Sequence, residues 1–98
     1  MTAVWRGMTQ EELDRAYNQA AYAPNMAEVV ARYARNSDAV RSRIGAPRRF
    51  SYGEGEKEGL DVFSPAETGS GAPIHVFLHG GAWRSGAARD YAFPAEVF

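Results

Sequence analysis

The residues best suited to chemistry form one short run, His79-Gly80-Gly81-Ala82-Trp83. The run follows Ile74–Leu78, an apolar segment that predicts a strand buried on both faces, as in a parallel sheet. Two adjacent glycines at the exit of a strand allow a turn that other residues cannot make, and backbone N–H groups then point at a cavity. Such donors stabilise the negative oxygen that forms when a nucleophile attacks an ester or amide carbonyl. The run therefore predicts an oxyanion hole.

Within this run we expect the backbone N–H groups of Gly81 and Ala82 to be the donors and Gly80 to shape the turn. The methyl group at position 82 predicts a negative φ there. Trp83 is expected to anchor the loop by packing, with a substrate contact as the alternative. A phosphate-binding loop over 79–86 is a weak alternative, because Gly-Lys-[Ser/Thr] is absent.

Composition excludes several other kinds of site. There is no cysteine and there are only 2 histidines, so a thiolate zinc site, a disulfide framework and a cysteine nucleophile are excluded. We expect no metal and no cofactor. His75 is expected to be structural, and Glu54, Glu56 and Glu58 to form a solvated face. The 11 basic and 12 acidic residues argue against nucleic-acid or membrane partners. No apolar segment is long enough for a signal peptide or a membrane span, and a cytoplasmic location is expected.

Two helices are predicted ahead of this run. Residues 9–12 have the form of a capping box, and apolar residues at helical spacing predict a helix over 10–22. A second helix is predicted over 26–44, ended by Gly45 in a left-handed conformation. Residues 37–38 mark either a kink or a restart of that helix.

The period of the pattern then changes from helical to alternating. Residues 49–52 and 60–63 alternate around a polar turn and predict an antiparallel strand pair. Residues 64–73 are rich in Gly, Pro and Ser and predict a loop. Residues 89–98 predict the start of a further helix, disturbed by Pro94.

The His-Gly-Gly-X-Trp run resembles the arylformamidase (kynurenine formamidase)-like and esterase branch of the α/β-hydrolase superfamily. Three further segments, 12–18, 60–65 and 83–93, fit the same branch, and the similarity extends from Thr9 onward. The resemblance implies an α/β fold. Residues 1–98 are then the N-terminal fragment of a single hydrolase domain, with a helical segment over 9–46 and the first strands, the oxyanion loop and the start of the next helix over 47–98. In such relatives the residue at His79 props the loop through hydrogen bonds; a role as general base is the alternative.

The resemblance also implies a triad of Ser, Asp or Glu, and His downstream of the oxyanion loop, and this chain has no Gly-X-Ser-X-Gly. We therefore expect the triad on a second polypeptide that completes the fold, arising from a nick, a split gene or a truncation. The predicted function is hydrolysis of a small ester or aryl formamide (or other amide) through an acyl-serine intermediate. The alternative is a non-catalytic binding or scaffolding subunit that keeps the fold. Whether the assembled unit is a homo-oligomer stays open.

Overall fold

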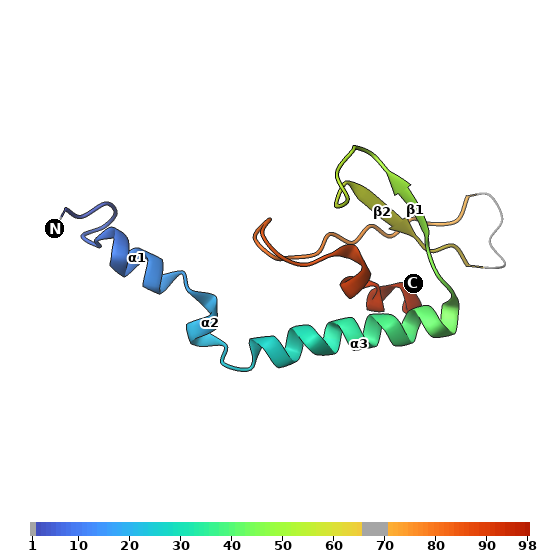
Figure 1. Cartoon of the computed structure of the whole chain (residues 1–98), viewed down its shortest axis with the longest axis horizontal. Helices are drawn as coiled ribbons and strands as arrows, with labels where there is room; N and C mark the ends of the chain where they lie inside the picture. The colour runs from blue at the N-terminus through green and yellow to red at the C-terminus, as the bar shows by residue number, and fades with distance from the viewer. Residues whose placement is uncertain (1, 66–70) are drawn as a thin grey trace. The chain divides into compact units, whose positions relative to one another are not determined.

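The computed structural model describes residues 2–65 and 71–98 of the chain. The chain divides into two compact units, Met1–Val30 and Ala31–Phe98, and helix α3 crosses the boundary between them (Figure 1). In the described ranges no helix has the length and apolar character that a membrane span requires. Helices and one two-stranded sheet make this a mixed α/β chain.

The first unit contains α1 (Gln10–Ala16) and α2 (Gln19–Tyr22). The predicted capping box is confirmed: the Thr9 N–H donates to the Glu12 carboxylate at 2.8 Å and the Glu12 N–H donates to the Thr9 hydroxyl at 3.2 Å. The prediction of one helix over 10–22 is wrong, because the chain turns extended at Asn18, with φ −76° and ψ 91°. A second short helix starts after Asn18, although the Asn18 side chain makes no capping hydrogen bond.

Helix α3 (Met26–Ile44) has the predicted bounds. Gly45 ends it with φ +95°, and its N–H donates to the Arg41 carbonyl at 2.9 Å. The helix is continuous through 37–38, so neither a kink nor a restart occurs there. Ser37 faces the interior and is fully buried.

The predicted strand pair is confirmed as β1 (Arg48–Ser51) and β2 (Gly59–Val62), each one residue ahead of the expected range. The strands are antiparallel, with Phe50 opposite Leu60. The turn between them is held by the Glu58 carboxylate, which accepts the Gly55 N–H at 2.6 Å. The predicted loop over 64–73 includes 66–70, which lie outside the described residues.

The prediction of a buried strand over Ile74–Leu78 is wrong for this chain. The segment has no strand conformation, and Ile74 and Leu78 are 89% and 87% exposed. A strand of a parallel sheet takes its hydrogen bonds and its burial from neighbouring strands. Among the described residues no strand pairs with this segment, so its apolar side chains have no neighbouring strands to pack against.

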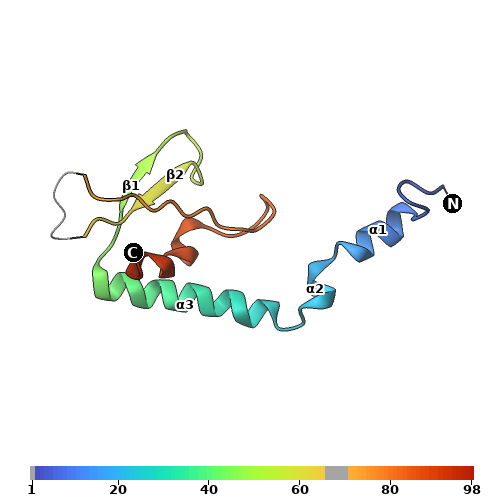
Figure 2. The ribbon, with the colours of Figure 1, turned by 180° about the vertical axis from the view of Figure 1, so that it is seen from behind.

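The final helix predicted over 89–98 is also replaced by two shorter elements, the 3₁₀ turns η1 (Ala88–Tyr91) and η2 (Phe93–Glu96). Pro94 has no N–H to continue a helix, and it lies in the first turn of η2, where none is needed. Both turns lie along α3 in the two opposite views (Figures 1 and 2). The core of the described residues is small: Val40 and Ala92 are its buried apolar side chains.

Candidate functional site

The loop that follows Ile74–Leu78 is closed by the carbonyl of Gly81. This oxygen accepts the N–H groups of Arg84 at 3.0 Å and Ser85 at 3.2 Å, and the Ser85 hydroxyl donates to it at 3.3 Å. Gly81 has φ +133°, and a Cβ placed on it would lie 2.0 Å from the Ser85 carbonyl oxygen. Backbone cannot move aside as a flexible side chain does, so position 81 requires glycine.

The conformation of Ala82 corrects the expectation from sequence. Ala82 has φ +52° and Trp83 has φ +58°, whereas a negative φ was expected at position 82. The Arg84 N–H bond to Gly81 makes these the two central residues of a β-turn, and two positive φ values are the mark of a type I′ turn. Each L-residue in this conformation costs roughly 1–2 kcal/mol.

Two backbone donors in this loop have no hydrogen-bond partner in the part of the chain that the structure describes. Among the described residues, the N–H groups of Gly81 and Ala82 donate to no hydrogen bond. Gly80 lies in open space, with nothing within 4 Å of a Cβ placed on it. The loop thus leaves free the two donors that the sequence predicts for an oxyanion hole, and their use for that purpose stays a prediction.

His79 lies against the loop. Its Nδ1 is 2.7 Å from the carbonyl oxygen of Gly80, and its ring stacks on that of Tyr91 with centroids 5.0 Å apart and planes 11° apart. A Cβ placed on Gly86 would lie 3.1 Å from His79 Nδ1, so the end of the loop passes close to the ring. His79 contacts the loop at both ends of the turn, as a supporting residue would.

Trp83 is fully exposed and packs against none of the residues that the structure describes. Its expected role as an anchor needs a surface beyond these residues and stays a prediction. The described ranges contain no group of three or more His, Cys, Asp or Glu that could hold a metal ion. His75 stacks on Phe98 with centroids 3.9 Å apart, a structural contact.

Two residues near the loop were given no role at the site from the sequence. Lys57, in the turn between β1 and β2, donates to the Gly86 carbonyl at 3.4 Å. Tyr91 lies in η1 and contacts His79 as described above. Lys57 is the single lysine of the chain, a weak signal in the sequence. The stacking of Tyr91 on His79 depends on the fold, so no local sequence pattern indicates it.

The second unit is hollowed on one side. An open concavity of about 2390 Å³ is lined by β2, the segment Ile74–Leu78, the candidate loop and the turns η1 and η2. Ligand pockets are typically about 300–1,000 Å³. The concavity is therefore much larger than a small-molecule site, and apolar side chains such as Leu60 and Phe77 face it.

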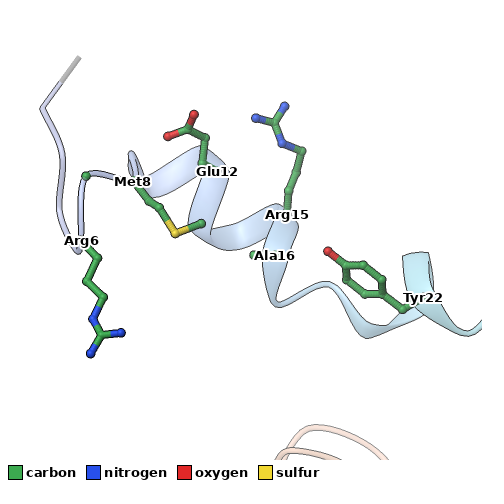
Figure 3. A pocket seen from close by; sticks show the side chains of 7 residues that line it. Arg6, Met8, Glu12, Arg15, Ala16 and Tyr22 are labelled. Carbon is green, nitrogen blue, oxygen red and sulfur yellow. The ribbon is translucent and has the colours of Figure 1, made fainter.

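A second concavity, of about 510 Å³, lies in the first unit around α1 and α2 (Figure 3). The Arg6 guanidinium and the Glu12 carboxylate point in opposite directions there (Figure 3). The Glu12 carboxylate is already bonded to the Thr9 N–H, and this bond lowers its pKa below the usual range of a glutamate. The polar groups do not converge, so this concavity is not a candidate site.

Comparison with known proteins finds similar curated sequences, among them the following two. The chain is 28% identical to kynurenine formamidase of Salmo salar over 105 aligned positions, which cover 93% of this chain and 33% of that protein. It is 28% identical to kynurenine formamidase of Danio rerio over 94 positions, covering 82% of this chain and 29% of that protein. The chain thus spans about a third of the length of the curated relatives it matches. No family model and no solved structure matches it.

Proposed function

We propose that this chain supplies the oxyanion loop of a serine hydrolase that acts on small esters or aryl formamides. The observation that carries the proposal is the loop itself: position 81 admits only glycine, and the N–H groups of Gly81 and Ala82 are free among the described residues. The similarity to two kynurenine formamidases supports a formamide-hydrolysing activity. The rest of the catalytic machinery lies outside this chain.

The proposed reaction proceeds in two steps. A serine hydroxyl from the complementing part attacks the substrate carbonyl while a histidine takes its proton, and the carbonyl π electrons move onto oxygen. That oxygen accepts the N–H groups of Gly81 and Ala82. The tetrahedral intermediate collapses, the alcohol or arylamine leaves with the proton from the histidine, and an acyl-serine remains; for a formamide it is a formyl-serine. Water then hydrolyses this ester and restores the serine.

A second polypeptide is the proposed partner. Ile74, Val76 and Leu78 belong to a segment without strand conformation and are 89%, 74% and 87% exposed. Fully burying one such side chain stabilises an assembly by about 1.5–3 kcal/mol. We propose that strands of the partner lie beside this segment and that its side chains fill the open concavity. The matched relatives, about three times as long as this chain, have the additional length that such a completion requires.

The test uses the assembly, purified through a tag on this chain. We expect it to hydrolyse p-nitrophenyl acetate and formanilide, and a fluorophosphonate to label a serine in the partner. Gly81→Ala should lower kcat by roughly 10²–10³ with KM changed much less, since the donors act on charge present only in the transition state. Arg84→Ala, a change of an exposed side chain in the same loop, is the control and should keep the parental rate.

The results separate the two functions expected from the sequence. An assembly that forms but neither hydrolyses these substrates nor reacts with the fluorophosphonate is a scaffold, and the proposal is then wrong. A Gly81→Ala assembly that forms normally, binds a substrate analogue normally and retains full activity shows that this loop is not the oxyanion hole.

A further inference from the structure

Tyr91 lies at the centre of a cluster of aromatic rings beside the candidate loop. Its ring centroid is 5.0 Å from that of His79 and 5.8 Å from that of Tyr33. Phe77 and Phe93 lie further out, at 6.4 Å and 6.5 Å. The planes of Tyr91 and His79 are only 11° apart, so this pair is stacked, while Tyr33 is tilted by 48°. Among the described residues, Tyr91 is thus the aromatic side chain that stacks directly on the loop.

Tyr91 is itself held by α3. The N–H of Phe93, two residues on, donates to the buried Ser37 hydroxyl at 3.1 Å. The Arg41 guanidinium donates to the carbonyl of Arg89, two residues before. Positions 37 and 41 are one helical turn apart and share a face of α3. The backbone on both sides of Tyr91 is therefore fixed to one rigid element.

His79 in turn fixes one peptide group of the loop. Its Nδ1 is 2.7 Å from the carbonyl oxygen of Gly80. A carbonyl oxygen only accepts, so Nδ1 must carry the hydrogen in this contact. The Gly80 carbonyl and the Gly81 N–H belong to the same planar trans peptide and point in opposite directions. When the Gly80 carbonyl is held toward His79, the Gly81 N–H therefore points away from His79.

We propose that Tyr91 is a positioning residue: by stacking on His79 it holds the Nδ1–H toward the Gly80 carbonyl and so aims the Gly81 N–H. The aim of that donor matters for catalysis only if the proposed function holds; the orientation of His79 does not depend on it. The Tyr91 hydroxyl makes no hydrogen bond to any described residue, so the ring face carries the effect. Phenylalanine should therefore replace tyrosine at this position, and leucine should not.

The test reads the histidine ring directly, by long-range ¹H–¹⁵N NMR of the whole chain. His75 and His79 are the 2 histidines of the chain, and His75→Gln assigns the signals. We expect His79 to be the Nδ1–H tautomer in the parent and in Tyr91→Phe. Tyr91→Leu should convert it to a mixture of tautomers and shift the Gly81 amide resonance. Tyr33→Leu, which removes a ring of the cluster that does not contact His79, is the matched control and should leave both unchanged.

Three results overturn the proposal: an Nε2–H tautomer in the parent, unchanged spectra in Tyr91→Leu, or the same change in Tyr33→Leu as in Tyr91→Leu. In the assembly, Tyr91→Leu should lower kcat roughly 10-fold, less than the 10²–10³ for losing a donor, with KM unchanged and Tyr91→Phe at the parental rate. If the parental assembly is inactive, the proposed function fails while the NMR result still decides the role of Tyr91.

Discussion

The hydroxyl of Ser37 accepts the backbone N–H of Phe93 at 3.1 Å, across 56 positions of sequence. Ser37 is completely buried, and the apolar side chains of Val40 and Ala92 are buried as well. This bond and the bidentate pair of Arg43 with Glu96, at 2.6 and 2.8 Å, tie η2 to α3. Because the described core is small, such polar bonds carry much of the contact between the two segments.

Ser37→Ala should loosen η2. The substitution leaves the part-buried Phe93 N–H without a partner, which costs about 1–3 kcal/mol. Hydrogen exchange of the Phe93 and Ala95 amides should speed up by roughly 5–150-fold as a result. Ser42→Ala is the control, because among the described residues the Ser42 hydroxyl bonds only to the Asp38 carbonyl of the same helix. Equal exchange in both variants would mean that the bond to Phe93 is absent in solution.

The pair of Arg43 and Glu96 predicts a pH dependence. The hydrogen bond from Arg43 lowers the pKa of Glu96, and the same bond raises the pKa of Arg43. A carboxyl whose pKa is lowered on folding stabilises the structure above its unfolded pKa, and the contribution is lost as the pH falls through the folded pKa. The protection of the amides in 92–96, taken relative to their intrinsic exchange rates at each pH, should therefore fall as the pH falls below about 4.

Substitution of the arginine tests the cause. Arg43→Met should raise the midpoint at which the Glu96 carboxyl carbon titrates by NMR and remove this part of the pH dependence. Arg35→Met, on the same helix and without an ion pair among the described residues, should leave the Glu96 midpoint where it is. A Glu96 midpoint that is the same in the parent and in Arg43→Met would contradict the pair.

The exposed apolar segment Ile74–Leu78 predicts where the proposed partner binds. Val76 is 74% exposed, so Val76→Asp should leave the exchange pattern of the isolated chain unchanged. In the assembly the aspartate would be buried, and the dissociation constant should rise more than about tenfold. Val97→Asp, at 78% exposure but outside the segment, is the control. Parental affinity of the Val76→Asp chain, measured by titration of the partner, would place the interface elsewhere.

Helices and strands that depend only on the sequence close to them were predicted with nearly correct bounds. Helix α3 needs only its apolar spacing and Gly45, and the β1–β2 pair needs only alternation around a polar turn. The segment Ile74–Leu78 has the pattern of a buried strand, but a strand forms only where neighbours accept its hydrogen bonds. The apolar pattern of Ile74–Leu78 therefore predicted a strand that this chain does not form by itself.

In the candidate loop, too, the sequence pattern did not predict the conformation of individual residues. The glycines at 80 and 81 were predicted as the turn, yet the two differ: Gly81 is required by the approach of Ser85, and Gly80 is not crowded. The positive φ of Ala82 follows from the closure of the turn onto Gly81, which no local preference of alanine indicates. The contact of Tyr91 with His79 depends on how η1 is fixed to α3, a relationship between distant positions.

Ala82→Gly should stabilise the turn. Alanine at φ +52° carries a left-handed strain of roughly 1–2 kcal/mol, which glycine removes. Glycine also makes the unfolded chain more flexible, and this offsets part of the gain in stability. The net gain of up to about 1 kcal/mol should slow hydrogen exchange of the Arg84 and Ser85 amides by up to about fivefold. The N–H of residue 82 is kept, so the proposed activity should be retained. Ala87→Gly is the matched control: Ala87 is extended, with φ −146°, so glycine there relieves no strain and should not slow exchange. Faster exchange in Ala82→Gly than in the parent would show that residue 82 does not hold a positive φ in solution.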